Sequence, residues 1–261
     1  MFDFHIHTKV SHDSVEEPMA VVRRAEELGL SEICFTDHYD ATPNPGENDY
    51  ILDINDYIST YSAVSSERVK IRRGVEFGLV DHNVGEMKRV EKLIDPDFVI
   101  GSVHFADHLE IYTEDFWKGR STHESFEAFL KQELKCVAMH DDFDVLGHIN
   151  YACKSPFNPR KIPLAYKDFP EYFDKIMKIL IEKGKGMEVN TSGIDRVGIF
   201  LPDYECLKRF RDLGGRIVTV GSDAHDVSRV GQYADRAVDM LKDIFGCVYT
   251  FEKREPIPHK L

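Results

Sequence analysis

The sequence predicts an α/β protein built as a seven-unit (β/α) barrel. Seven apolar runs typical of buried strands alternate with seven amphipathic stretches typical of helices. Each strand-like run also ends in polar residues that can bind a metal or a substrate. Such alternation gives a parallel sheet. A closed or nearly closed barrel brings all these strand ends together, so it explains the pattern better than an open sheet does.

The first strand-like run, residues 2–8, carries His5 and His7. Alternate residues of a strand point to the same side, so these two imidazoles are expected to converge. The other strand-like runs cover residues 33–38, 71–76, 98–104, 145–148, 187–190 and 217–225. The helical stretches, with apolar residues at three- and four-residue steps, cover residues 18–28, 54–66, 84–93, 123–140, 170–183, 203–213 and 230–244.

Length and composition favour a single domain over residues 1–261, because barrels of about 250 residues are common and no long linker interrupts the chain. No apolar stretch reaches the ~18 residues that span a membrane, and no export signal is visible, so we expect a cytoplasmic protein without a membrane partner. Five scattered cysteines form no CxxC pair, which is typical of ordinary thiols.

A net charge of −13 disfavours a nucleic-acid partner, since such partners usually meet a basic surface. The basic residues of segment 67–73 alternate with apolar ones, which predicts a solvated strand edge. A small phosphorylated substrate is compatible with the acidic chain if metal ions supply local positive charge. The sequence makes no prediction of oligomeric state.

Nine potential ligands lie at or near the predicted strand ends, which is too many for one ion. They are His5, His7, Asp13, His38, Glu76, His104, His148, Asp223 and His225. A single catalytic zinc usually takes three protein ligands, whereas nine nitrogen and carboxylate donors suit two or three divalent ions. The set has no thiolate and is compatible with zinc, manganese or iron.

Six motifs together resemble those of the PHP (polymerase and histidinol phosphatase) superfamily. They are His5-Ile-His7-Thr8, Thr36-Asp37-His38, Gly74-Val75-Glu76, Gly101-Ser102-Val103-His104, Gly147-His148 and Gly221-Ser222-Asp223-Ala224-His225. Segments around His104, His148, Glu188 and Asp223 are more similar to the stand-alone histidinol-phosphate phosphatases than to polymerase-fused domains. The resemblance implies a distorted (β/α)7 TIM-like barrel, a three-metal centre formed by the nine ligands, and hydrolysis of L-histidinol phosphate in histidine biosynthesis.

One ligand position departs from part of the superfamily, in which a histidine commonly stands six residues after the second histidine of the first motif. This chain has Asp13 there and His12 one place earlier. We interpret Asp13 as the ligand and His12 as a solvated loop residue. For the substrate phosphate, Arg160 and Arg196 are candidates, because both follow strand-like runs and an arginine can bind phosphate in a forked geometry.

Two further features leave alternatives open. Glu188 and Asn190 could face the barrel mouth or only hydrogen-bond at the strand end, and we favour the second interpretation for Asn190. The segment 107–122, with Tyr112, Phe116 and Trp117, could act as a lid over the substrate or pack its aromatic residues against the barrel.

The chemistry that these residues predict is hydrolysis of a phosphomonoester by metal-activated hydroxide, with Asp223 or His225 passing the proton. A PHP phosphoesterase acting on another small phosphate ester and a metal-dependent nuclease are alternatives with the same centre. The nuclease would be favoured by a basic groove, which the acidic composition does not indicate. A scaffold without activity would be expected to lack some ligands, yet all nine positions are filled.

Overall fold

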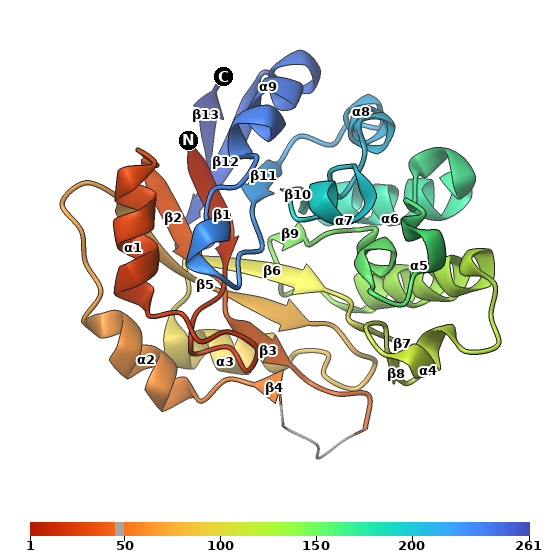
Figure 1. The fold of residues 1–261 in the computed structure, drawn as a ribbon, viewed down its shortest axis with the longest axis horizontal. Coiled ribbons are helices and arrows are strands. Elements are labelled where there is room, and N and C mark those ends of the chain that lie inside the picture. Colours follow the sequence, from red (N-terminus) through yellow and green to blue (C-terminus); the bar gives the residue numbers. More distant parts are fainter. Residues whose placement is uncertain (45–49) are drawn as a thin grey trace.

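The computed structural model describes residues 1–44 and 50–261, and a ring of parallel strands lies at its centre (Figure 1). Each strand pairs in parallel with the next in the order β1 (Phe2–Ile6), β2 (Glu32–Phe35), β5 (Lys70–Gly78), β6 (Phe98–Ser102), β9 (Val145–Leu146), β10 (Gly186–Asn190) and β11 (Val218–Gly221). Ile6, at the end of β1, forms a parallel bridge with Ala224, which follows β11, so the last strand of the series lies next to the first. The predicted distorted (β/α)7 barrel is confirmed.

Each predicted helical stretch corresponds to one helix outside the ring. These are α1 (Pro18–Glu27), α2 (Ile54–Ser62), α3 (Glu86–Ile94), α5 (Thr122–Met139), α6 (Pro170–Glu182), α8 (Tyr204–Asp212) and α9 (Ala234–Ile244). The last begins four residues later than predicted, because Gly231 and Tyr233 adopt left-handed backbone conformations that a helix cannot contain. Two short helices, α4 (Glu114–Trp117) and α7 (Gly193–Val197), were not predicted.

The shorter elements lie in the connections between strands and helices. They are β3 (His38–Asp40), β4 (Tyr50–Ile51), β7 (Phe105–Ala106), β8 (Leu109–Glu110) and the 3₁₀ turns η1 (Tyr151–Lys154), η2 (Pro159–Lys161), η3 (Tyr166–Asp168) and η4 (Val227–Arg229). Among them β3 positions the site most directly. It pairs in parallel with β5, which sets His38 opposite Glu76. Among the described residues, no helix combines the length and apolar character needed to cross a bilayer.

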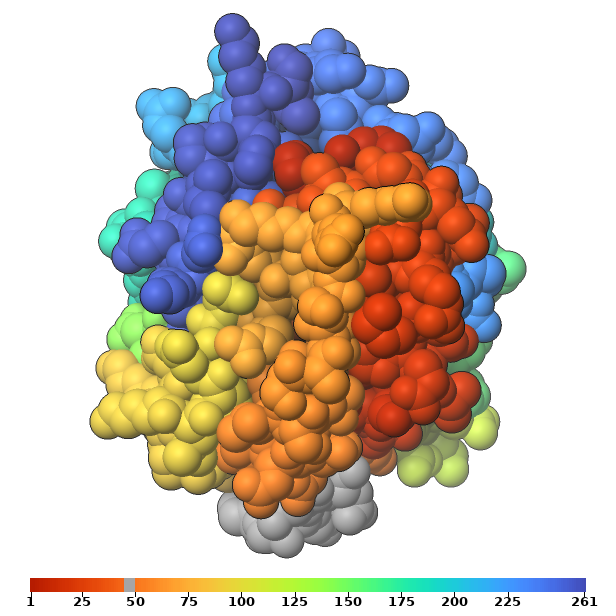
Figure 2. Space-filling model, turned by 90° about the vertical axis from the view of Figure 1, so that its left-hand side faces the viewer, coloured from red at the N-terminus to blue at the C-terminus, as the bar shows by residue number. Residues whose placement is uncertain are grey.

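A C-terminal hairpin that the sequence pattern did not reveal closes the end of the barrel opposite the polar strand ends. Its strands are β12 (Cys247–Glu252) and β13 (Glu255–Lys260), drawn in dark blue against the orange and yellow segments in Figure 2. Phe251 joins an apolar cluster with strand residues Phe4, Cys34, Phe98, Ile100 and Val145. Because these strands form the ring, the cluster fills the barrel interior beneath the polar strand ends.

The same hairpin corrects the interpretation of segment 67–73. The predicted edge position is wrong, because β5 lies between β2 and β6. The segment is solvated only in part: Lys70 is exposed, but the Arg72 side chain is buried. Arg72 Nε donates to Glu32 Oε1 at 2.6 Å, and Arg72 Nη2 donates to Glu252 Oε2 at 2.8 Å. A buried guanidinium is tolerated only with such partners. One partner is 180 residues away in the chain, so the local pattern could not show it.

We predict that Phe251→Ala lowers the free energy of unfolding by about 3–5 kcal/mol, the cost of a cavity left by a buried phenylalanine. Phe251 is 2% exposed, and its ring centroid lies 4.8 Å from that of Phe98. Urea unfolding measures the change. Phe157→Ala is the control, because Phe157 is 41% exposed and should lose less than about 1 kcal/mol. Equal losses in the two variants would contradict the proposed packing.

Candidate metal centre

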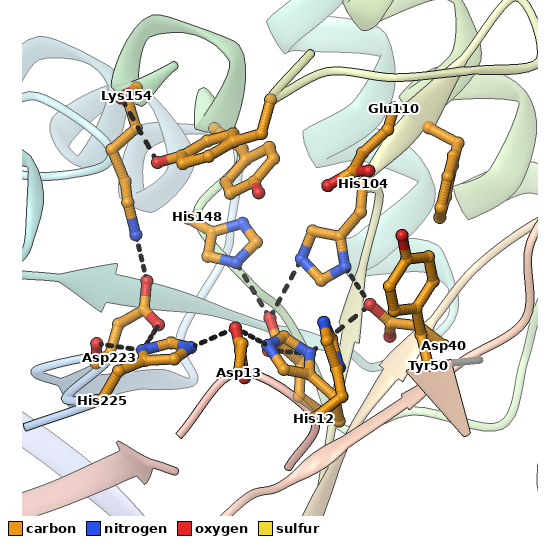
Figure 3. Close-up of a pocket in the computed structure, with 15 residues that line it drawn as sticks. His12, Asp13, Asp40, Tyr50, His104, Glu110, His148, Lys154, Asp223 and His225 are labelled. Carbon is orange, nitrogen blue, oxygen red and sulfur yellow. Dashed lines mark hydrogen bonds and ion pairs between the residues drawn. The ribbon is translucent and has the colours of Figure 1, made fainter. Parts of the chain in front are cut away.

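The structure brings the nine predicted ligands together at the C-terminal end of the barrel, where most of them line a cavity of about 140 Å³ (Figure 3). Potential ligand atoms form four overlapping groups, in each of which all atoms lie within 4.8 Å of one another. The groups are His7 with Asp13, His38 and His225; His5 with Glu76 and His148; His5 with His7 and Asp223; and His38 with Asp40 and His104. The overlap is the geometry expected of a multinuclear site.

Glu76 lies at the centre of these groups. It is fully buried on β5, and its carboxylate faces five imidazoles from four other chain segments. The distances from Glu76 oxygens are 2.9 Å to His148 Nε2, 3.1 Å to His38 Nδ1, 3.2 Å to His5 Nε2, 3.4 Å to His104 Nε2 and 3.5 Å to His7 Nε2. One carboxylate therefore connects most of the cluster and is suited to bridge metal ions.

Hydrogen bonds on the outer side of the rings fix which nitrogen faces inward. The Nδ1 of His5 lies 2.6 Å from Glu188 Oε1, and the Nδ1 of His225 donates to the Asp223 carbonyl oxygen at 3.0 Å. With Nδ1 protonated, each Nε2 presents a lone pair to the cluster. On the side of the rings that faces the cluster, nitrogen lone pairs therefore lie against carboxylate oxygens. This arrangement is stable only with protons or cations between these atoms.

Several inward atoms also lack a hydrogen bond although they are buried. They are the Nε2 atoms of His5 and His7, His38 Nδ1 and Glu76 Oε2. A buried polar atom without a partner costs about 1–3 kcal/mol, so a folded protein rarely leaves several of them side by side. Divalent cations would satisfy all of them. The residues therefore fit a group of metal ions with nitrogen and oxygen ligands.

The pKa directions show how strongly this site attracts positive charge. Burial lowers the pKa of His104, but the carboxylates of Asp40 and Glu76 outweigh burial and raise it to about 10. Burial would raise the pKa of Glu76, but the surrounding imidazoles hold it well below its usual value. His7 differs, because burial and its neighbours His225 and His38 lower its pKa. Metal binding would displace the imidazole protons and take over their role as countercharge.

The local backbone at the last strand end is shaped to deliver Asp223. Its φ of 55° lies in the left-handed region, which is uncommon for a residue other than glycine and is found at functional sites. Two residues earlier, a Cβ on Gly221 would lie 2.3 Å from the Cβ of His5. Glycine at that position lets β11 approach β1, so Asp223 Oδ1 reaches within 3.7 Å of His5 Nε2.

The structure orients Asp13 and His12 differently. Asp13 Oδ2 lies 2.9 Å from His225 Nε2 and 3.5 Å from His38 Nε2, whereas His12 lines the cavity and packs its ring against Tyr50 at 4.5 Å. These contacts place Asp13 among the potential ligand atoms, and its role as the ligand stays a prediction. His12 is a cavity residue in addition to a loop residue.

The two predicted phosphate arginines have different positions. Arg196 lines a second cavity of about 280 Å³, which shares Lys154, Asp223 and His225 with the central cavity. Arg160 is exposed on η2 and lines neither of these two cavities. The structure therefore brings Arg196 close to the candidate metal centre and does not bring Arg160 there.

Sequence reasoning missed three charged side chains of the cavity, Lys154, Asp40 and Glu110. The Lys154 side chain is 12% exposed and pairs its Nζ with Asp223 Oδ2. Asp40 is 4% exposed, and its Oδ2 lies 2.6 Å from His104 Nδ1. The alternation of His38 and Asp40 was a signal for the second, because both stand on one side of a strand. No pattern indicated the first, which projects from a 3₁₀ turn.

Glu188 and Asn190 both hydrogen-bond within the site. Glu188 accepts from His5 Nδ1 and, at 2.8 Å, from the backbone amide of His148, so it supports two predicted ligands. Asn190 Oδ1 accepts from the Ser192 amide at 3.0 Å, and its Nδ2 lies 3.3 Å from Asp223 Oδ2. The preferred interpretation of Asn190, hydrogen bonding at the strand end, agrees with these contacts.

The segment 107–122 combines the two predicted alternatives. Phe116 and Trp117 are buried in the main apolar core, and Trp117 Nε1 donates to the Ile111 carbonyl. Glu110 and Tyr112 instead line the cavity. Only the first part of the segment therefore contributes to the site, and the second part anchors it to the barrel.

The chain is similar to known proteins in its sequence and in its fold. The family model described as "PHP domain" matches residues 3–192. A histidinol-phosphatase of Lactococcus lactis is 31% identical over 247 residues, covering 92% of this chain and 90% of that protein. A protein of Clostridium acetobutylicum described as "Probable histidinol-phosphatase" is 30% identical over 263 residues, covering 97% of this chain and 98% of the relative.

A solved structure agrees along the whole chain. The histidinol phosphate phosphatase of Lactococcus lactis, in complex with zinc, L-histidinol and phosphate, superimposes with a TM-score of 0.83 at 27% identity. The match covers 98% of both chains. The family match spans most of the chain and includes seven of the nine predicted ligands. On these grounds the chain belongs to the PHP domain family.

Proposed function

We propose that this protein is a metal-dependent phosphomonoester hydrolase whose substrate is L-histidinol phosphate, with two or three divalent ions held by the nine ligands described above. The observation that carries the proposal is the buried carboxylate of Glu76, surrounded by imidazoles whose lone pairs face it. The similarity to histidinol-phosphatases of comparable length supports the choice of substrate.

When bound, the divalent ions would neutralise the phosphoryl oxygens and lower the pKa of a water ligand, which provides a nucleophile at neutral pH. The chain supplies the remaining parts. Lys154 lines both the central cavity and the adjoining one, and its ammonium group can bind a phosphoryl oxygen there. Asp223 or His225 would pass the proton to the leaving oxygen. His225 has the more exposed side chain, 31% against 5%, but its Nε2 can carry a proton only while it does not hold a metal ion.

The far wall of the cavity suits the rest of such a substrate. The Glu110 side chain lines the cavity there, and among the described residues no hydrogen bond or ion pair reaches its carboxylate (Figure 3). A carboxylate would repel a phosphate, so it fits a cationic group at the other end of the molecule. Histidinol phosphate carries an amine there, whereas a sugar phosphate does not.

Metal removal is the first test. We expect chelation to abolish phosphate release from L-histidinol phosphate, and zinc or manganese to restore it after reconstitution. The single positive charge of Lys154 does not balance a phosphate dianion, and the metal ions would also provide the nucleophile. Initial rates are compared with those on sugar phosphates, nucleotides, a phosphotyrosine peptide and single-stranded DNA. Preference by orders of magnitude for histidinol phosphate is the expected result. Equal low rates on all esters would refute the substrate, and cleavage of DNA alone would favour the nuclease.

Lys154→Met tests the proposed phosphate contact. A charge-assisted hydrogen bond contributes about 1.5–3 kcal/mol, so we expect kcat/KM to fall by about ten- to a hundredfold. Lys161→Met is the matched control, because Lys161 is exposed and does not line the central cavity. Steady-state kinetics at constant metal concentration measures both. An unchanged kcat/KM for the Lys154 variant would remove it from the site.

The two arginines provide a matched pair. Arg196→Ala should raise KM for histidinol phosphate about tenfold or more, because it deletes a cation from the cavity that adjoins the cluster. Arg160→Ala, at an exposed position outside both cavities, should leave KM close to that of the unaltered protein. The opposite pattern would show that Arg160 binds the phosphate and that its loop takes another position when substrate is present.

A further inference from the structure

We propose that Asp40 is a positioning residue for one metal of the cluster: it holds the His104 ring so that Nε2 faces the metal, and Gly78 provides the space that Asp40 needs. This inference rests on the metal centre of the proposed function and not on the identity of the substrate. Asp40 is not among the nine predicted ligands.

The contact between Asp40 and His104 has the geometry of a hydrogen bond and not of a shared metal ligand. Asp40 Oδ2 lies 2.6 Å from His104 Nδ1, which leaves no room for an ion between the two atoms. The carboxylate therefore accepts a hydrogen bond from the protonated Nδ1 of His104. In the neutral ring that binds a metal, the lone pair then resides on Nε2, which lies 3.4 Å from Glu76 Oε1. Carboxylates that hold a ligating histidine in this way fix its tautomer and its orientation.

Gly78 makes this arrangement possible. It stands opposite Asp40 in the parallel pair of β3 and β5. A Cβ at Gly78 would lie 2.5 Å from Asp40 Oδ1, 2.8 Å from its Cγ and 3.0 Å from its Cα. Because the last of these atoms belongs to the backbone, a side-chain rotation alone would not relieve the clash. Any larger residue at position 78 should therefore displace Asp40 without changing a charged group.

The effect should be confined to part of the metal centre. Of the four groups of potential ligand atoms, only one contains His104, and that group also contains His38 and Asp40. The two groups that contain His5 include neither Asp40 nor His104. The group that contains Asp13 shares only His38 with Asp40, and the Asp40 Oδ2 to His38 Nδ1 distance of 3.4 Å is longer than the 2.6 Å contact with His104. Loss of Asp40 should thus weaken one metal position and leave the others occupied.

The experiment counts metal ions per chain. The unaltered protein, Asp40→Asn and Gly78→Ala are loaded with manganese or zinc, dialysed, and analysed by inductively coupled plasma mass spectrometry. We expect each variant to retain about one ion fewer per chain, with affinity at the weakened position reduced about 10- to 100-fold. Asp81→Asn is the matched control, because Asp81 is exposed, follows β5, the strand of Gly78, and pairs with Lys135 outside the cluster. It should keep the full metal content.

Metal content and affinity equal to those of the unaltered protein in both variants would overturn the proposal. Loss of every ion would also overturn it, because the effect would then not be confined to one position. If Asp40→Asn does not fold, as judged by circular dichroism, Gly78→Ala decides alone, since it preserves every charged group. If the unaltered protein binds metal but does not hydrolyse histidinol phosphate, the substrate proposal fails while the metal counts still test Asp40.

Discussion

The structure depends most on one buried carboxylate, that of Glu76. Its two oxygens face imidazole nitrogens delivered by strand ends on several sides of the barrel. In the protein alone this carboxylate must be balanced by protonated imidazoles, because an isolated buried charge is very costly. Divalent cations resolve the same conflict with more positive charge. The barrel therefore positions a set of groups that are stable together only when a cation lies among them.

Around this centre, a layer of acceptors fixes the imidazoles from outside. Glu188 serves His5, Asp40 serves His104, and the Asp223 carbonyl serves His225. These partners come from β10, β3 and the end of β11, so the ligand geometry depends on the register of strands that do not all carry ligands themselves. An outer layer of this kind restricts each ring to one orientation and reduces the reorganisation needed when a metal binds.

The acidic character of the chain is compatible with the proposed anionic substrate because the charges are separated in space. The net charge of −13 belongs to the whole protein. In the cavity, the proposed metal ions and Lys154 would provide positive charge at one end, and the carboxylate of Glu110 lies at the other (Figure 3). Within a cavity of this size, local charges determine which part of a substrate binds where. A phosphate ester with a cation at its far end matches both.

The sequence by itself determined the alternation of strands and helices, and the nine candidate ligands, because both follow from local periodicity and from the polar residue at each strand end. Tertiary structure alone decided the rest. Lys154 meets Asp223 across 69 residues, and Arg72 meets Glu252 across 180. Phe251 closes the barrel from a hairpin with no distinctive pattern. Such contacts depend on how strands close into a ring, and local sequence patterns carry no information about partners so distant in the chain.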